Sequence, residues 1–168
     1  MAIRRATRTD IARIRQRLAE LPNPPYLPSD DDVAGLFEDR NAVAVMGDAG
    51  EFGQAHWSEV NSISTIVHLL PHNMGVRQIE KLLLALFDAL WEVPAAQTHI
   101  VNGRSPAAGT SDFGQRKADT IADLIKGRTG VRPDVAATFD SLHTRTGTRI
   151  SMPLALARAQ LRRSAGGN

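Results

Sequence analysis

The stretch VHLLPHNMGVRQIEKLLLALFDALW, residues 67–91, decides the fold of this 168-residue chain. It has the pattern of a buried strand, a tight turn that holds Gly75, and a long amphipathic helix. Apolar residues recur along the helix at steps of three, one, three, one and three, which predicts one continuous buried stripe. The stripe consists of Ile79, Leu82, Leu83, Leu86, Phe87 and Leu90. A strand, a turn and a helix in this order form the arrangement with which many proteins hold a phosphate at a helix N-terminus.

The order of elements expected along the whole chain is β-α-α-β-β-β-α-β-α-β-β, which predicts a mixed α/β domain. Thr9 or Asp10 is expected to cap the first helix, and Gly147 is expected to lie in the turn of a C-terminal hairpin. The expected strands are 2–6, two within 41–60, 62–70, 97–103 and two within 136–154, and the expected helices are 9–21, 29–40, the one after Gly75, and 110–127.

Composition limits the class of protein. With 42% hydrophobic and 23% charged residues, the chain is ordinary for a soluble globular domain. It has no cysteine, so disulfides and thiolate metal sites are excluded. The longest apolar block, Leu82–Leu90, is interrupted by Asp88 and is too short to span a bilayer. We therefore expect one domain over residues 1–154, a basic tail without core-forming residues over 155–168, and no membrane partner.

Arginines cluster at both ends of the chain, a distribution also found in proteins that bind nucleic acids. The clusters are Arg4, Arg5, Arg8, Arg13, Arg15 and Arg17, and then Arg158, Arg162 and Arg163. Aromatic residues make up only 5% of the chain, and none alternate with the arginines to form a stacking surface. We therefore expect solvated helix faces rather than a nucleic-acid interface.

The order of elements resembles the fold of the GCN5-related N-acetyltransferases. IRRATRTDIARIRQRL, residues 3–18, is similar to the first strand and helix of that family. Residues 68–90 are similar to its fourth strand, cofactor loop and third helix, and TRISMPL, residues 148–154, to its last strand. The resemblance covers residues 2–154 and rests on order and patterning. More narrowly, TIVHLLPHNMG followed by THIVNGRSP is similar to acetyltransferase-like proteins encoded among the virion genes of tailed bacteriophages.

The resemblance implies a mixed, mostly antiparallel central sheet flanked by helices, with acetyl-CoA as cofactor and an amine as acceptor. The family's cofactor motif, Gln/Arg-x-x-Gly-x-Gly/Ala, falls on residues 72–77, where Gly75 matches, His72 replaces Gln/Arg and Arg77 replaces the last small residue. The Arg77 guanidinium either pairs with the pyrophosphate or fills the groove that it needs. Asn102 either contacts the pantetheine arm or caps its strand. The implied cofactor-binding residues are Leu69, Leu70, His72, Asn73, Met74, Gly75, Val76, Arg77 and Asn102.

Acetyl transfer needs a base for the acceptor amine and an acid for the leaving thiolate. The base candidates are His68, His56 and Glu59, each of which can also be a structural polar residue on a half-buried strand. Strand alternation puts His56 and Glu59 on opposite faces, so both line one cleft only if a bulge intervenes. The acid of this family is often a tyrosine beyond the fifth strand, whereas the one tyrosine here is Tyr26, between the first two helices.

Two functions stay open at this point. The first is an acetyl-CoA-dependent N-acetyltransferase, which we expect in the cytoplasm. The second is a non-catalytic structural or interaction component with a degenerate cofactor loop and protein partners in an assembly, such as a tailed-phage virion. Met74 and Arg77 in the loop, the missing tyrosine acid and the basic tail favour the second. No metal site is predicted, since the five histidines form no i, i+4 pair on a predicted helix and have no acidic partner at ligand spacing.

Overall fold

The computed structural model describes residues 2–20, 28–71, 73–106, 122–123, 126–127, 132–139 and 145–165. Seven strands in these residues form one sheet, in the order β1-β2-β3-β4-β5-β7-β6. All neighbouring pairs are antiparallel except β4 and β5. The strands are β1 (Ile3–Arg5), β2 (Ala42–Gly47), β3 (Phe52–Ser58), β4 (Ile63–Leu70), β5 (Ile100–Pro106), β6 (Asp134–Phe139) and β7 (Arg145–Pro153). This mixed, mostly antiparallel sheet confirms the predicted fold class.

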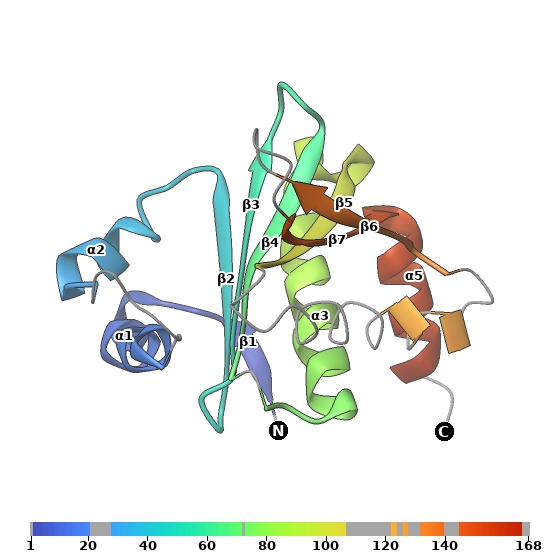
Figure 1. Cartoon of the computed structure of the whole chain (residues 1–168). Coiled ribbons are helices and arrows are strands. Elements are labelled where there is room, and N and C mark those ends of the chain that lie inside the picture. The colour runs from blue at the N-terminus through green and yellow to red at the C-terminus, as the bar shows by residue number, and fades with distance from the viewer. Residues whose placement is uncertain are drawn as a thin grey trace.

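Helices cover both faces of the sheet (Figure 1). One face carries α1 (Ile11–Ala19) and α2 (Asp30–Gly35), and the other carries α3 (Val76–Trp91) and α5 (Leu154–Ala165). Short 3-10 turns, η1 (Arg8–Asp10) and η2 (Pro94–Thr98), precede α1 and β5. None of the helices in the described part of the chain combines the length and apolar character needed to cross a bilayer.

The larger core lies between the sheet and the pair α3 and α5. Leu82, Leu86 and Leu90 of the predicted stripe are fully buried there, against side chains from β2, β3, β4 and β5. Burying one leucine contributes roughly 1.5–3 kcal/mol, so the stripe holds α3 firmly in place. A smaller core on the opposite face packs α1 and α2 against the sheet. Its buried residues are Ile14, Val33, Met46, Phe52 and Leu70.

The C-terminal region differs from two expectations. The expected turn at Gly147 is wrong, because Gly147 lies inside β7, opposite Thr138 of β6 and Pro106 of β5. The expected tail is wrong as well, because residues 154–165 form α5 and pack on the core. The buried residues of α5 are Leu154, Ala157 and Leu161. Their steps of three and four form a short apolar stripe beside the half-buried Arg158 and the exposed Arg162 and Arg163.

The other predicted elements agree with the structure where they are described. The first strand, the first two helices, the three central strands and α3 occur in the predicted order. Asp10 directly precedes α1 but makes no capping hydrogen bond to it; its carboxylate instead accepts from the amide of Thr7, the N-cap residue of the 3-10 turn η1. Of the predicted helix at 110–127, only 122–123 and 126–127 are described, and these are helical. Its remaining residues and the loop at 21–27 lie outside the described residues.

Candidate functional site

Strand β4 contains a bulge that changes which side chains share a face of the sheet. Gln54 of β3 lies opposite His68, but the next residue, Ala55, lies opposite Ile66, so Val67 has no counterpart on β3. Directly opposed residues point to the same face, and the extra residue reverses the alternation beyond it. His68 therefore lies on the same face as Gln54 and His56. The sequence predicts that His56 and Glu59 line one cleft only if a bulge intervenes. The bulge in the structure lies in β4 instead, and it places His68, not Glu59, on the face of His56.

The bulge coincides with the point where β4 and β5 separate. The parallel pairing of these strands runs from Ile63 and Ile100 to Ile66 and Gly103, and then stops. Beyond Gly103, β5 continues to pair only with β7. The end of β4, which pairs with β3 but no longer with β5, leads through Pro71 to the start of α3. Bulges occur frequently beside active sites, because they end pairing and redirect side chains.

The start of α3 is capped from within the protein. Gly75 is the N-cap residue, and its amide donates to Oε1 of Gln78 at 2.9 Å. Nε2 of Gln78 in turn lies 3.5 Å from Oε1 of Glu51, a long donor–acceptor contact. Glu51 is buried, and its Oε2 has no hydrogen-bond partner within the described residues. It lies over Gly47, where an added Cβ would overlap Oε2.

Two features leave the start of α3 open to a ligand. Arg77 is exposed, and its side chain makes no hydrogen bond or ion pair with any residue that the structure describes. The first turn of α3 carries no acidic residue. A cation at a helix N-terminus is unfavourable with respect to the helix dipole, so neither feature serves to stabilise the helix. Both features favour the approach of an anion.

Gly75 is not required by the fold. Its φ of −69° and ψ of 161° are accessible to any residue, and an added Cβ would meet only Oε1 of Gln78, at 3.7 Å. An ordinary side chain therefore fits here in the absence of a ligand. Gly75 is exposed, so the space that a Cβ would occupy opens toward solvent.

The other residues expected at the cofactor site fall into three groups. Met74 and Leu70 are buried in the two cores, and Leu69 packs against the larger one, so these three contribute backbone rather than side chain to the surface. Asn73 is exposed beside Gly75. His72 and the side chain of Val76 lie outside the described residues.

Asn102 stands where β4 and β5 are about to separate. It lies opposite Thr65 of β4 and Ser151 of β7, one residue before the end of the β4–β5 pairing. Its Oδ1 is buried and has no hydrogen-bond partner among the residues that the structure describes. A buried acceptor without a partner costs about 1–3 kcal/mol. The atom is therefore available to a ligand N–H, and the alternative of a strand cap is not seen at Oδ1.

The base candidate His56 is held at both ring nitrogens. Its Nδ1 lies 3.3 Å from Oδ2 of Asp39, and its Nε2 lies 2.7 Å from Nε2 of Gln54. With the ring proton on Nδ1, the nitrogen beside Asp39, Nε2 is left to accept from the Gln54 amide. Asp39 and His56 are each 38% exposed, so the pair is reachable from solvent. A carboxylate that orients an imidazole is the arrangement of an activated base.

Sequence reasoning missed Asp39. It follows α2, 17 positions before His56 along the chain, and no local pattern links the two residues. The third base candidate, Glu59, lies in the exposed turn after β3, away from this pair. His68 is half-buried, and its ring lies 6.3 Å from the ring of Phe52, centroid to centroid.

A second contact of a histidine, between His99 and Ser64, is structural. Oγ of Ser64 and Nδ1 of His99 lie 3.1 Å apart, and both residues are buried in the sheet beneath η2. Because neither reaches solvent, this pair joins β4 to the start of β5 and offers no surface for a substrate. Within the described residues, no three His, Cys, Asp or Glu side chains gather into a group that would hold a metal ion.

No protein-family model matches the sequence, and no curated protein sequence matches it at a significant level. Solved structures do match the fold. The ribosomal-protein-S18-alanine N-acetyltransferase from Escherichia coli is similar with a TM-score of 0.55 at 10% identity, over 92% of this chain and 94% of that one. The aminoglycoside 6'-N-acetyltransferase from Enterococcus faecium is similar with a TM-score of 0.54 at 13% identity, over 92% and 97%.

A third similar structure is the GNAT-like decarboxylase GphF in complex with isobutyryl-CoA. It has a TM-score of 0.54 at 13% identity, over 92% of this chain and 100% of that one. At such identities the likeness shows the fold alone. The chain therefore has the fold of the GCN5-related N-acetyltransferases, as its pattern of elements predicted.

Proposed function

We propose that this protein transfers an acetyl group from acetyl-CoA to the amine of a small molecule or a protein. The observation that carries the proposal is the start of α3, where exposed Arg77 and a first turn without acids follow directly on the separation of β4 from β5. The N-terminus of a helix attracts anions, and a guanidinium binds phosphate through two parallel hydrogen bonds. The solved structures of the same fold include two N-acetyltransferases and one complex with an acyl-CoA, which supports this choice of cofactor.

The residues present fit the cofactor. Arg77 and the first amides of α3 would hold the pyrophosphate, and the absence of a side chain at Gly75 would let it approach the backbone. The unpartnered Oδ1 of Asn102 would accept from an amide N–H of the pantetheine arm. The exposed side chain of Gln78 must rotate away from the Gly75 amide to free that donor.

Bound acetyl-CoA supplies an acetyl group activated as a thioester. The protein's part is then to move two protons. Asp39 fixes the ring of His56 so that Nε2 carries the free lone pair, and an acceptor ammonium takes the place of the Gln54 amide as donor to Nε2. The acceptor ammonium would lose one proton to Nε2 of His56 and become nucleophilic, and its nitrogen would release a second proton to water as the C–N bond forms and the C–S bond breaks. His68 follows directly on the bulge, and we assign to it the return of a proton to the leaving thiolate, in place of the tyrosine that the chain lacks.

An assay of thiol release tests the proposal directly. The purified protein is supplied with acetyl-CoA and a panel of amines that includes aminoglycosides, polyamines and peptides with a free N-terminus. We expect turnover with at least one class, an activity loss of about tenfold or more in His56→Gln, and a rise in KM for acetyl-CoA in Arg77→Ala. The control is Arg163→Ala, an exposed arginine on α5, which should leave both parameters unchanged. Failure of the protein to bind acetyl-CoA at millimolar concentration would contradict the proposal.

A non-catalytic module is the second candidate, and two observations favour it. The Gly75 amide and both ring nitrogens of His56 already have partners within the protein. In this alternative the loop only caps α3, and the protein acts as a component of an assembly, a tailed-phage virion being the setting that the narrower resemblance suggests. A protein that binds acetyl-CoA but shows no turnover with any amine would favour an intermediate case, in which the fold binds the cofactor without catalysis.

A further inference from the structure

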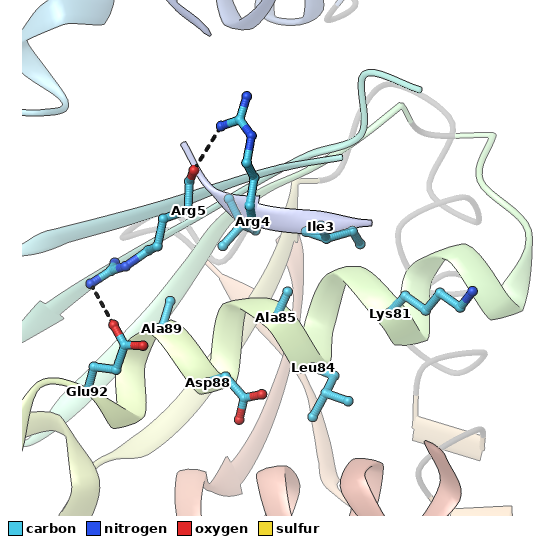
Figure 2. Close-up of a pocket in the computed structure, with 10 residues that line it drawn as sticks. Ile3, Arg4, Arg5, Lys81, Leu84, Ala85, Asp88, Ala89 and Glu92 are labelled. Carbon is cyan, nitrogen blue, oxygen red and sulfur yellow. Dashed lines mark hydrogen bonds and ion pairs between the residues drawn. The ribbon is translucent and has the colours of Figure 1, made fainter. Parts of the chain in front are cut away.

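An open groove of about 350 Å³ lies between strand β1 and helix α3, on the edge of the sheet (Figure 2). None of the residues of the candidate acetyl-CoA site lines it. Its two long walls are the backbone of β1 and one stripe of α3. The lining residues of α3 are Lys81, Leu84, Ala85, Asp88, Ala89 and Glu92.

The wall formed by β1 offers unpaired backbone groups. Strand β1 is the end of the sheet and pairs only with β2. The amide of Ala6 donates to Ala44 and the carbonyl of Ala2 accepts from Asp48, so the even-numbered residues face β2. In an antiparallel ladder the alternate residues, Ile3 and Arg5, then direct their N–H and C=O groups outward. Among these outward groups, only the Arg5 carbonyl has a partner in the described part of the chain, Nη1 of Arg4 at 3.0 Å.

The wall formed by α3 has the length and shape for one extended segment. From Lys81 to Glu92 the helix rises about 16 Å, which equals about five residues of a β-strand. Small side chains, Ala85 and Ala89, form the floor between the two charged ends, and the half-buried Leu84 lies beside them. The floor is therefore apolar and shallow enough for a strand to lie on it.

The charge left over in the groove is positive. Glu92 pairs with Arg5 at 3.4 Å, and Asp88 pairs with Arg158 at 2.6 Å and with Arg162 at 3.0 Å. Figure 2 shows Lys81 at the opposite end of the α3 wall from Glu92. Lys81 is exposed and has no ion-pair partner within the described residues. Both acids of the groove are thus neutralised, whereas Lys81 is not.

We propose that this groove binds an extended, acidic segment of another polypeptide, which adds as a strand to β1. The segment's main chain would bond to the outward groups of Ile3 and Arg5, as in other cases of strand addition to an exposed sheet edge. Alternate side chains would pack on Ala85 and Ala89, and a carboxylate would lie beside Lys81. The site is separate from the acetyl-CoA site, so it serves to recruit a protein partner rather than to carry out the reaction.

Binding of a fluorescein-labelled, end-blocked heptapeptide tests the proposal by anisotropy. The peptide has glutamate at positions 1 and 7, valine at 3 and 5, and threonine between them, so that valines and glutamates share the face toward α3. The decisive pair of variants is Arg5→Pro and Arg5→Ala. Proline removes the outward N–H of residue 5 without breaking the β1–β2 ladder, whereas alanine removes only the side chain. We expect Arg5→Pro to abolish binding and Arg5→Ala to weaken it by at most about threefold. Equal binding by the two variants would overturn strand addition.

Charge and partner identity are tested with the same probe. We expect Lys81→Glu to weaken binding by about three- to tenfold, and the matched control Arg163→Glu to change it little, since Arg163 lies on α5 outside the groove. A peptide with lysine in place of glutamate should bind more weakly than the acidic one. No binding of the acidic heptapeptide at millimolar concentration overturns the proposal. Sedimentation equilibrium that shows a dimer lost in Arg5→Pro also overturns it, because the occupant is then a second copy of this chain.

Discussion

The starts of helices α2 and α3 have opposite designs. Ser29 caps α2 by accepting from the amide of Asp32, and three aspartates fill the first turn. The first turn of α3 holds no acid, begins at Gly75 and exposes Arg77. Negative charge at a helix N-terminus is stabilising, and positive charge is not. The aspartates of α2 thus provide negative charge at its N-terminus from within the chain, whereas the N-terminus of α3 lacks such charge and can accept an external anion.

Giving α3 the charge of α2 should have the largest effect. In Arg77→Glu, the affinity for acetyl-CoA is expected to fall about 100-fold, since a cation is lost and an anion repels the pyrophosphate. The same change should raise the free energy of unfolding by a few tenths of a kcal/mol, because the acid suits the helix dipole. Calorimetric titration and thermal denaturation measure the two effects. Equal affinity in the variant and the wild type would show that the start of α3 binds no anion.

Asp39 tests the chemistry next to this binding site. We expect Asp39→Asn to lower kcat about 30-fold with KM for acetyl-CoA unchanged, because His56 loses the carboxylate that orients its ring. The control is Asp31→Asn, an exposed aspartate in the first turn of α2. If kcat is the same in Asp39→Asn, the pair of Asp39 and His56 is structural, and the catalytic assignment fails.

Substitution of Gly75 tests whether the glycine is needed for folding or for ligand binding. Gly75→Ala should leave the thermal midpoint within about 2 °C of the wild type, since the backbone angles and the space around Gly75 accept a Cβ. Acetyl-CoA affinity should fall about tenfold, because the pyrophosphate can no longer approach the amides closely. An unfolded or strongly destabilised variant would contradict the geometry described for this position.

At the start of η1 and α1, the acid Asp10 is paired with Arg4. Removing this pair should have the smallest effect of the changes considered. Arg4 donates to Asp10 through two hydrogen bonds of 2.7 and 2.8 Å, which lowers the pKa of Asp10 from 3.8 to about 2. The stability from this shift is present above the unfolded pKa and is lost as the pH falls from about 4 through 2. Because Arg4 is half exposed, solvent screening keeps this contribution to the free energy of unfolding small. Denaturant titrations of wild type and Arg4→Ala should differ at pH 6, and the difference should shrink as the pH falls through 4 toward 2 and below.

The sequence predicted those parts of the fold that depend on local periodicity. The α3 stripe was visible because six apolar residues keep the helical period without a break. The stripe of α5 has only three members, and the arginines around them suggested a tail. The spacing of three and four residues between Leu154, Ala157 and Leu161 is nevertheless helical, and it is the signal that predicts this helix.

The site was less predictable than the fold, because it depends on register and on distant pairing. Nothing in the letters TIVHLL marks Val67 as the extra residue, and without the bulge His68 would face away from His56. Asp39 reaches His56 only because β2 pairs with β3 and brings the end of the α2 loop beside it. The environment of Arg77 also required the structure, since the sequence left open whether its guanidinium pairs with the pyrophosphate or fills the groove; the structure shows the side chain exposed.

Amide chemical shifts during a titration with acetyl-CoA test the central claim most directly. The account predicts saturable shifts at Gly75, Arg77 and Gln78 of the α3 start, together with Asn102 on β5, and no comparable change at Asp31 in the first turn of α2. The same titration of Arg77→Glu should require about 100-fold more ligand. Unchanged spectra at millimolar acetyl-CoA, or shifts of equal size at both helix starts, would contradict it.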